Sequence, residues 1–276
     1  IFLRGTIGIS SKLKIPFFLL GATVIAVGTS SPDLFVGISA ISKHKQDIMF
    51  GAIIGSTIAN IFLCVGFASL IYSVPCEKQD RSTKFGIYYN TLFVLLFCTF
   101  LVLTGGKIGI IFSIFLILSF LFFIFCIIQS SKKESAEPEQ IKFTKLYHDI
   151  ILLVIGLFGL LFFSDLLVNL IVKLSIEKEI HEKAISASIV SFSNSIPEII
   201  TSILAAFKKR GKIIMGNVIG SNIFIVGGIV GFTSLAYNVI AEQPAMVSLH
   251  ILKLDIPMFF FASILLLIFF TLKSHC

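Results

Sequence analysis

The 276-residue sequence contains no tryptophan and few charged residues. Only 13% of its residues are charged, whereas a soluble domain carries about a quarter. Hydrophobic residues make up 56% of the chain and form repeated runs that can cross the roughly 30 Å hydrocarbon core of a bilayer. The shortage of charge excludes an ordinary water-soluble domain. It predicts an all-α polytopic membrane protein whose main partner is the lipid bilayer.

Motifs for common enzyme chemistry are also absent from the sequence. It holds neither the phosphate-binding pattern GxxxxGK[ST] nor HExxH, and its apolar runs contain no Ser–His or Cys–His arrangement. The cysteines lack the paired spacing of a disulfide framework or a zinc site; they are Cys64, Cys76, Cys98, Cys126 and Cys276. We therefore expect no enzyme activity and no cofactor.

Eight apolar segments predict membrane-spanning helices. Their approximate ranges are 15–41, 47–72, 86–104, 107–128, 147–174, 184–206, 212–237 and 247–272. The opening stretch "IFLRGTIGIS" resembles the tail of an earlier helix and lacks the basic start and cleavage site of a signal peptide. We therefore expect the sequence to be a piece of a longer chain.

An internal repeat relates two parts of the sequence. Residues 21–70 align without a gap on residues 186–235 at an offset of 165, with 17 of 50 positions identical. The repeat keeps "SSPDLF" over "SIPEII" and "GAIIGSTIANI" over "GNVIGSNIFIV". Five predicted spans, an odd number, separate equivalent helices, so the two halves should cross the membrane in opposite directions. Inverted repeats of this kind are typical of secondary transporters.

The positive charges predict an orientation in the membrane. The net charge of +7 arises from Lys and Arg residues that fall between the spans, which is the distribution of topology signals rather than of a nucleic-acid-binding patch. Most of them lie on the cytoplasmic side if the polar segment 129–146 is cytoplasmic. The expected organisation is an N-terminal half (1–128), a cytoplasmic linker (129–146) and a C-terminal half (147–276). We expect a monomer in the plasma membrane, with no nucleic-acid partner.

Polar side chains recur at helical spacing within the repeated spans. The first repeat and the second supply two carboxylates among hydroxyl and amide oxygens: Thr29, Ser30, Asp33, Ser56, Asn60, Asn194, Ser195, Glu198 and Ser221. An oxygen-only set suits a hard cation such as Ca²⁺ or Na⁺. An ion pair with a buried Lys or Arg is the alternative, but no such residue lies within these spans away from their ends. The Gly51/Gly55 and Gly216/Gly220 pairs indicate close helix packing.

Pro32 and Pro197 also favour a cation site, because each removes a backbone donor from its helix and so frees a carbonyl oxygen. Pro32 should free the carbonyl of Gly28, and Pro197 that of Ser193. Freed carbonyls in hydrocarbon are tolerated only where they are buried in protein or line a hydrated cavity. We therefore expect them to serve as additional cation ligands.

The motifs "GATVIAVGTSSPDLFVG…GAIIGSTIANIF" and "IVSFSNSIPEIITS…GNVIGSNIF" resemble the two α-repeats of the cation/calcium antiporter superfamily, which includes the sodium/calcium exchangers. The resemblance implies a ten-helix fold of two inverted five-helix halves, of which this sequence would lack most of the first helix and all of the last. It also implies exchange of Ca²⁺ against Na⁺.

The resemblance also implies a ligand set. The two acidic ligands fall on Asp33 and Glu198, and the polar ligands fall on Thr29, Ser30, Ser56, Asn60, Asn194, Ser195 and Ser221. Carbonyl ligands fall near Ala26 and Ser191. The chain departs from the family at Ile225, an apolar residue at a position that is commonly Asn or Asp.

The leading hypothesis is therefore a secondary antiporter that exchanges Ca²⁺ for Na⁺ by alternating access. Because Ile225 offers no ligand, coupling to H⁺ or dependence on K⁺ is an alternative. A homologue that binds cations without transporting them is another.

Overall fold

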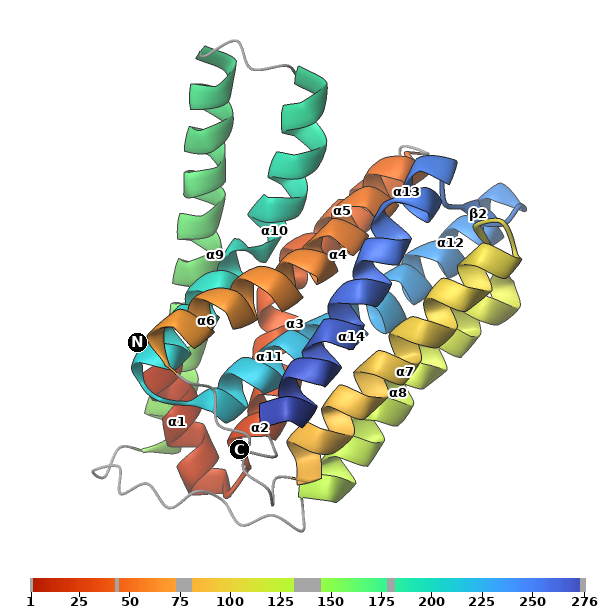
Figure 1. Ribbon diagram of the computed structural model, residues 1–276. Coiled ribbons are helices and arrows are strands. Elements are labelled where there is room, and N and C mark those ends of the chain that lie inside the picture. The colour runs from red at the N-terminus through yellow and green to blue at the C-terminus, as the bar shows by residue number, and fades with distance from the viewer. Residues whose placement is uncertain (1, 43–44, 73–80, 132–144, 178–181, 274–276) are drawn as a thin grey trace.

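The computed structural model describes the chain except for residues 1, 43–44, 73–80, 132–144, 178–181 and 274–276, and it leaves out the side chains at 48, 164–165 and 167–191. The described chain is almost entirely helical (Figure 1). The elements of the N-terminal half are α1 (Phe2–Leu13), α2 (Phe17–Leu20), the π-helical η1 (Gly21–Ile25), α3 (Ala26–Thr29), α4 (Ser31–Ser42), α5 (Gln46–Ala59), the π-helical η2 (Asn60–Cys64), α6 (Val65–Ile71), α7 (Arg81–Leu103), β1 (Lys107–Ile108) and α8 (Ile110–Ser131).

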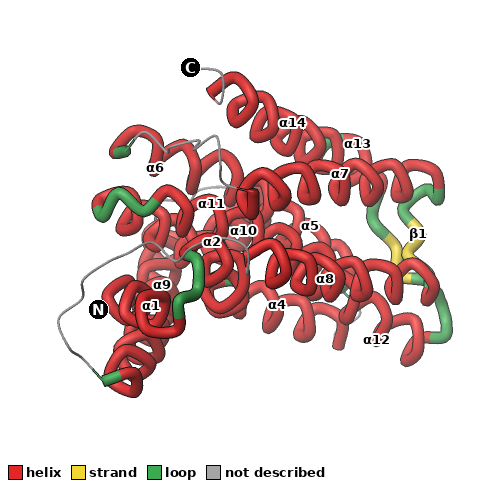
Figure 2. The backbone as a smooth tube through the Cα atoms, turned by 90° about the horizontal axis from the view of Figure 1, so that it is seen from below, coloured by secondary structure: helices red, strands yellow, loops and turns green. Residues whose placement is uncertain are grey.

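The C-terminal half has a similar series of elements. These are α9 (Leu146–Glu177), α10 (Glu182–Phe207), α11 (Gly211–Ile223), the π-helical η3 (Phe224–Val230), α12 (Gly231–Ala241), β2 (Ala245–Met246), α13 (Leu249–Lys253) and α14 (Asp255–Lys273). Strands β1 and β2 pair in antiparallel fashion, with Lys107 opposite Met246. Figure 2 shows this strand pair linking loops of the two halves at one end of the helical bundle.

The eight predicted spans each correspond to helical structure. Among the described residues, six helical runs are long and apolar enough to cross a membrane: Met49–Ile71, Arg81–Leu103, Ile110–Ser131, Leu146–Phe163, Gly211–Ala241 and Leu249–Leu272. A further pair, Phe17–Thr29 and Ser31–Ser42, is bent by 43° at a break between its two helices. The remaining predicted span falls on α10, which is apolar over Phe192–Phe207. The chain is thus an all-α polytopic membrane protein.

The two repeats run in opposite directions. In Figure 1 the continuous run α5–η2–α6 descends from the upper right to the lower left, whereas its repeat counterpart α11–η3–α12 ascends from the lower left to the upper right. Each of these runs contains one π-helical segment: η2 begins four residues after Ser56, and η3 begins three residues after Ser221. The inverted topology predicted from the odd number of intervening spans is therefore confirmed.

Close packing places the bent first span against α11. A Cβ added at Gly220 would lie 2.4 Å from the carbonyl oxygen of Ala22, and one at Gly216 would lie 2.5 Å from that of Phe18. Only glycine permits this approach, which brings the backbone of η1 against the middle of the most buried span. Among the described residues, the nearest atom to a Cβ added at Gly51, in the first repeat, is a side-chain atom of Ile251 at 3.9 Å. Gly216 and Gly220 therefore produce the tight packing predicted for the second repeat.

Helices α7, α8, α9 and α14 lie around the bent first span and α11, and they present apolar side chains outward. Leu103, Ile111, Phe158 and Phe261 are all largely exposed, as expected where hydrocarbon rather than water is the solvent. Of the predicted linker 129–146, residues 132–144 lie outside the described chain, with α8 extending to Ser131 on one side and α9 beginning at Leu146 on the other. Its role as a linker stays a prediction.

Candidate cation-binding site

The candidate site begins at a break in the first repeat. Helix α3 ends at Thr29 and α4 begins at Ser31, while Ser30 between them has φ −85° and ψ 10°. Pro32 explains the break, because it has no N–H to donate to the Gly28 carbonyl and its ring clashes with that carbonyl. The break directs Thr29, Ser30 and Asp33 into the protein, where each is fully buried.

The second repeat contributes the matching residues without such a break. Pro197 lies inside the continuous helix α10, with Ser195 and Glu198 fully buried beside it and Asn194 almost so. Helix α10 packs against both α5 and η2 of the first repeat. This packing places the acidic segment of one repeat against the serine and asparagine of the other.

Asp33 receives a hydrogen bond at each carboxylate oxygen. The Asn194 side-chain nitrogen donates to Oδ1 at 2.8 Å, and the Ser56 hydroxyl donates to Oδ2 at 3.1 Å. One donor comes from each repeat. The Asp33 carboxylate thus lies at the interface between the two halves.

Glu198 is only partly satisfied. Its Oε1 accepts a hydrogen bond from the Ser30 hydroxyl at 2.7 Å, whereas its Oε2 is buried and has no hydrogen-bond partner among the described residues. The two carboxylates are close enough to interact electrostatically. The ion pair that the described residues form is Lys12–Asp149, elsewhere in the protein, so neither acid has a described cationic side chain to neutralise it.

The two repeats meet directly at a pair of serines. Ser56 Oγ lies 3.1 Å from Ser195 Oγ, and the Ser195 hydroxyl can also donate to the Ser56 carbonyl at 3.3 Å. Of the other predicted ligands, Ser221 and Asn60 are fully buried. Within the described part of the chain, the Ser221 hydroxyl and the Asn60 side-chain nitrogen have no hydrogen-bond partner. Ile225, the repeat counterpart of Asn60, is also fully buried and contributes no polar atom.

The backbone carbonyls near the break are already engaged. The Gly28 carbonyl accepts a hydrogen bond from the Ser31 hydroxyl at 2.8 Å, so the acceptor that Pro32 releases is capped within its own segment. The Ala26 carbonyl accepts from the Ser30 N–H at 3.0 Å. Each would bind a cation only by its second lone pair or by exchange of these donors. Ser191, near the second predicted carbonyl ligand, lies within the continuous helix α10, and its side chain is outside the described residues.

One neighbour of the site was not anticipated from the sequence. The Thr29 hydroxyl lies 3.3 Å from Oδ1 of Asn217, and Nδ2 of Asn217 is buried with no hydrogen-bond partner among the described residues. The repeat counterpart of Asn217 is Ala52, so a search for residues that are polar in both repeats passes over it. Its position beside Thr29 follows from the glycine-mediated packing of α11 on the bent span.

The chemistry of this arrangement favours a hard cation. Two buried carboxylates carry charge that is costly in a low-dielectric interior unless it is paired. The surrounding hydroxyl and amide oxygens suit Ca²⁺ or Na⁺ rather than a thiophilic metal. Among the described residues, no group of three or more His, Cys, Asp or Glu side chains is gathered for a metal ion, so neutral oxygens would have to complete the coordination.

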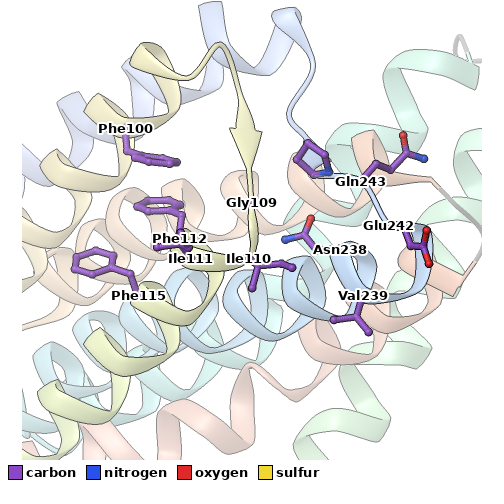
Figure 3. A pocket seen from close by; sticks show the side chains of 11 residues that line it. Phe100, Gly109, Ile110, Ile111, Phe112, Phe115, Asn238, Val239, Glu242 and Gln243 are labelled. Atoms are coloured by element: carbon purple, nitrogen blue, oxygen red, sulfur yellow. The ribbon is translucent and has the colours of Figure 1, made fainter.

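A cavity of about 1220 Å³ lies away from this site, at the ends of α7, α8 and α12 (Figure 3). Phe100, Phe112 and Phe115 line one side of it, and Asn238 and Glu242 lie on another. Its lining is mainly apolar, and it contains none of the predicted cation ligands.

Comparison with known proteins identifies the family to which the chain is similar. The family model described as "Sodium/calcium exchanger protein" matches residues 1–129 and 148–275. The "Uncharacterized membrane protein MJ0091" of Methanocaldococcus jannaschii is 31% identical over 259 residues, covering 94% of this chain and 83% of that protein. The "Putative antiporter CaxA" of Alkalimonas amylolytica is 27% identical over 253 residues, covering 88% of this chain and 78% of that protein.

Solved structures give the same result at the level of the fold. The sodium-calcium exchanger NCX_Mj, soaked with 2.5 mM Na⁺ and 10 mM Sr²⁺, superposes with a TM-score of 0.81 at 28% identity, covering 97% of this chain and 84% of that one. The same exchanger soaked without Na⁺ or Ca²⁺ gives a TM-score of 0.76 at 27% identity, covering 98% and 90%. By its sequence motifs, its inverted repeats and its buried pair of carboxylates, this chain belongs to the sodium/calcium exchanger family of membrane proteins.

Proposed function

We propose that this protein is a secondary antiporter that exchanges Ca²⁺ for Na⁺ across the membrane. The observation that carries the proposal is the pair of fully buried carboxylates, Asp33 and Glu198, that come from opposite repeats and have no described cationic partner. Together they match the charge of one Ca²⁺ or of two Na⁺. Ions that compete for the same two charges cannot occupy the site fully at the same time, and this competition is what couples their movements.

In this structure, side-chain donors form hydrogen bonds to both acids. The hydroxyls of Ser30 and Ser56 donate to Glu198 and Asp33. A hydroxyl can rotate and present a lone pair, so a cation can replace these hydrogen bonds without moving the backbone. Asn194 differs, because its nitrogen donates to Asp33 and its amide must turn over before its oxygen faces an ion.

Alternating access would come from movement of the first helix of each half, α1 and α9, past the remaining helices. These two helices pack closely on each other, with the Phe2 backbone against Gly156 and the Lys12–Asp149 ion pair at one end. Such a pair can move as a unit past a fixed site, as in other inverted-repeat transporters. We place the protein as a monomer in the plasma membrane, with the 129–146 segment in the cytoplasm.

The test is ⁴⁵Ca²⁺ uptake by proteoliposomes under an outward Na⁺ gradient. Asp33→Asn and Glu198→Gln should each reduce Na⁺-driven uptake by about 100-fold or more, because each removes half of the charge that binds the ion. Asp47→Asn, which alters an exposed acid at the start of α5, is the matched control and should transport normally. Normal uptake by either site variant would show that the acids are misassigned.

Ile225 supports a second candidate, exchange coupled to H⁺ or dependent on K⁺. Since this residue supplies no oxygen where Asn60 supplies one in the other repeat, one cation position has fewer ligands. The same proteoliposomes distinguish the candidates: uptake driven by a pH gradient alone, or only with K⁺ present, would replace the Na⁺ proposal. Ca²⁺ binding without flux under any gradient would instead indicate a cation-binding homologue that does not transport.

A further inference from the structure

Asn217 of α11 is a buried amide beside a predicted ligand that belongs to the other repeat. Its side chain and that of Thr29 are both fully buried. The Thr29 hydroxyl lies 3.3 Å from Asn217 Oδ1. Nδ2 of Asn217 has no hydrogen-bond partner among the described residues, so Thr29 is the described partner of this amide. Loss of the contact would leave a buried amide unsatisfied at both ends, which is costly.

The backbone at Asn217 packs directly on the bent first span. A Cβ added at Gly21 would lie 3.1 Å from the Asn217 backbone nitrogen, and one at the neighbouring Gly216 would lie 2.5 Å from the carbonyl oxygen of Phe18. These contacts involve backbone, which cannot yield as a flexible side chain can. The Asn217 side chain is therefore presented to Thr29 from a closely held position.

The Thr29 hydroxyl has one proton and three acceptors within reach. It lies 3.1 Å from the Ile25 carbonyl, 3.4 Å from the Ala26 carbonyl and 3.3 Å from Asn217 Oδ1. Ala26 is a predicted carbonyl ligand, and its oxygen already accepts a hydrogen bond from the Ser30 N–H. A second hydrogen bond, from Thr29, would occupy the remaining lone pair of that oxygen.

Donation to Asn217 avoids this conflict. With its proton on Asn217 Oδ1, the Thr29 oxygen keeps its lone pairs for a cation, and the Ala26 carbonyl keeps its second one. Donation to the Ile25 carbonyl would also spare Ala26, but it would leave the Asn217 amide without a described partner. The contact with Asn217 therefore satisfies both side chains and leaves the predicted ligand oxygens available.

The other repeat does not reproduce this pair. The counterpart of Asn217 is Ala52, and that of Thr29 is Asn194. Ala52 has no polar side-chain atom, and Asn194 donates to Asp33 at 2.8 Å. The inverted symmetry that relates the two acids therefore does not account for Asn217, which serves the Thr29 side of the site alone.

We propose that Asn217 is a positioning residue of the cation site: it accepts the proton of the Thr29 hydroxyl, so that the Thr29 oxygen and the Ala26 carbonyl can bind an ion together. Asn217 acts through Thr29 and does not touch the ion. The inference rests on the proposed function only in taking the site to bind a cation. Without Asn217, the hydroxyl proton turns to the carbonyls of its own helix, and the ion loses ligand oxygens.

The test is a double-mutant cycle on equilibrium ⁴⁵Ca²⁺ binding by the purified protein. Thr29→Val has nearly the same shape but removes a ligand oxygen, and it should weaken binding about tenfold. Asn217→Ala should weaken binding about three- to tenfold by itself, but less than about twofold in the Thr29→Val background. In the Thr29→Ser background, which keeps a hydroxyl, the effect of Asn217→Ala should return. A role in packing alone would give the same factor in every background.

Asn90→Ala is the matched control, because it removes another fully buried asparagine, on α7 and outside the ligand set. It should leave Ca²⁺ affinity within about twofold of the parent. If the alanine variant does not fold, Asn217→Leu, which keeps the side-chain volume without an acceptor, takes its place in the cycle.

Equal effects of Asn217→Ala with and without the Thr29 hydroxyl, or no effect in either case, would overturn the proposal. A parent protein that binds no Ca²⁺ would overturn the cation site and this proposal with it. Ca²⁺ binding that shows the expected coupling, without Na⁺-driven uptake, would overturn the exchange function and support the role of Asn217.

Discussion

At the scale of single residues, the site depends on which donors can turn away from the acids. Ser30 and Ser56 offer hydroxyls that both donate and accept. Asn194 offers an amide whose nitrogen is fixed on Asp33 at 2.8 Å. The amide nitrogen has no lone pair to offer a cation, so an arriving cation must displace this donor, whereas each hydroxyl needs only to rotate.

Replacement of Asn194 by threonine tests this difference. Asn194→Thr removes a hydrogen bond worth about 1 kcal/mol from the ion-free site and supplies a hydroxyl that can rotate. We expect the apparent Ca²⁺ affinity in ⁴⁵Ca²⁺ uptake to rise about three- to tenfold. Asn90→Thr, at a buried asparagine on α7 outside the candidate ligand set, controls for loss of an amide. An unchanged or weaker Ca²⁺ affinity in Asn194→Thr would contradict the argument.

A second residue-scale prediction concerns Ile225. Ile225→Asn restores the amide present at the counterpart Asn60, so it should lower the Na⁺ concentration for half-maximal exchange by a few-fold. In the absence of ions the new buried amide lacks a partner and should destabilise the protein by about 1–3 kcal/mol. Thermal unfolding with and without Na⁺ measures both effects. Equal destabilisation in the two conditions would mean that position 225 does not face the ion.

At the scale of elements, the α1–α9 pair depends on glycine. A Cβ at Gly5 would lie 2.5 Å from the Leu153 nitrogen, and one at Gly156 would lie 2.5 Å from the Phe2 Cα. These contacts involve backbone, which cannot shift as a flexible side chain can. The Lys12–Asp149 ion pair adds a polar contact at one end. The pair is therefore built for close packing, as is common between membrane helices.

Two glycines of α9 provide a matched comparison. Gly156→Ala forces α9 away from α1, and we expect a loss of about 1–3 kcal/mol in stability with reduced Ca²⁺ exchange. Gly159→Ala, at a position with no described neighbour within 4 Å, should leave both unchanged. Thermal unfolding and ⁴⁵Ca²⁺ uptake are the measurements. Similar results for the two variants would show that α1 and α9 do not need this contact.

At the scale of the whole molecule, the inverted repeats set which ends of the helices share a side of the membrane. The α10–α11 turn lies at one end of the bundle, and the β1–β2 strand pair lies at the other (Figure 1). Lys208 in the turn and Lys107 in β1 are both exposed. The positive-inside rule assigns the first to the cytoplasm and the second to the outside.

Cysteine labelling in whole cells tests this orientation. In a cysteine-free background, a membrane-impermeant maleimide should label Lys107→Cys in intact cells and Lys208→Cys only after permeabilisation. Purified variants labelled in detergent control for accessibility of each thiol. Labelling of Lys208→Cys alone in intact cells would place the 129–146 segment outside.

Much of the fold could be predicted from the sequence. The lengths of the apolar runs located the spans, because a bilayer of fixed thickness requires helices of matching length. The repeat offset then gave the inverted topology. The acidic and hydroxyl residues of the candidate site were also predictable, since charged groups within hydrocarbon are rare and carry function. Their pairing remained unknown.

The sequence by itself determined which polar residues lie within the spans and that the two repeats run in opposite directions. Only the tertiary structure decided that Asn217 reaches Thr29, that Asn194 donates to Asp33, and that the Gly28 carbonyl is capped by Ser31. The physical reason is that composition and hydrophobic period act within one helix. Contacts between the two halves depend instead on the close approach of two helices that glycines permit. The sequence of one helix does not specify which helix packs against it.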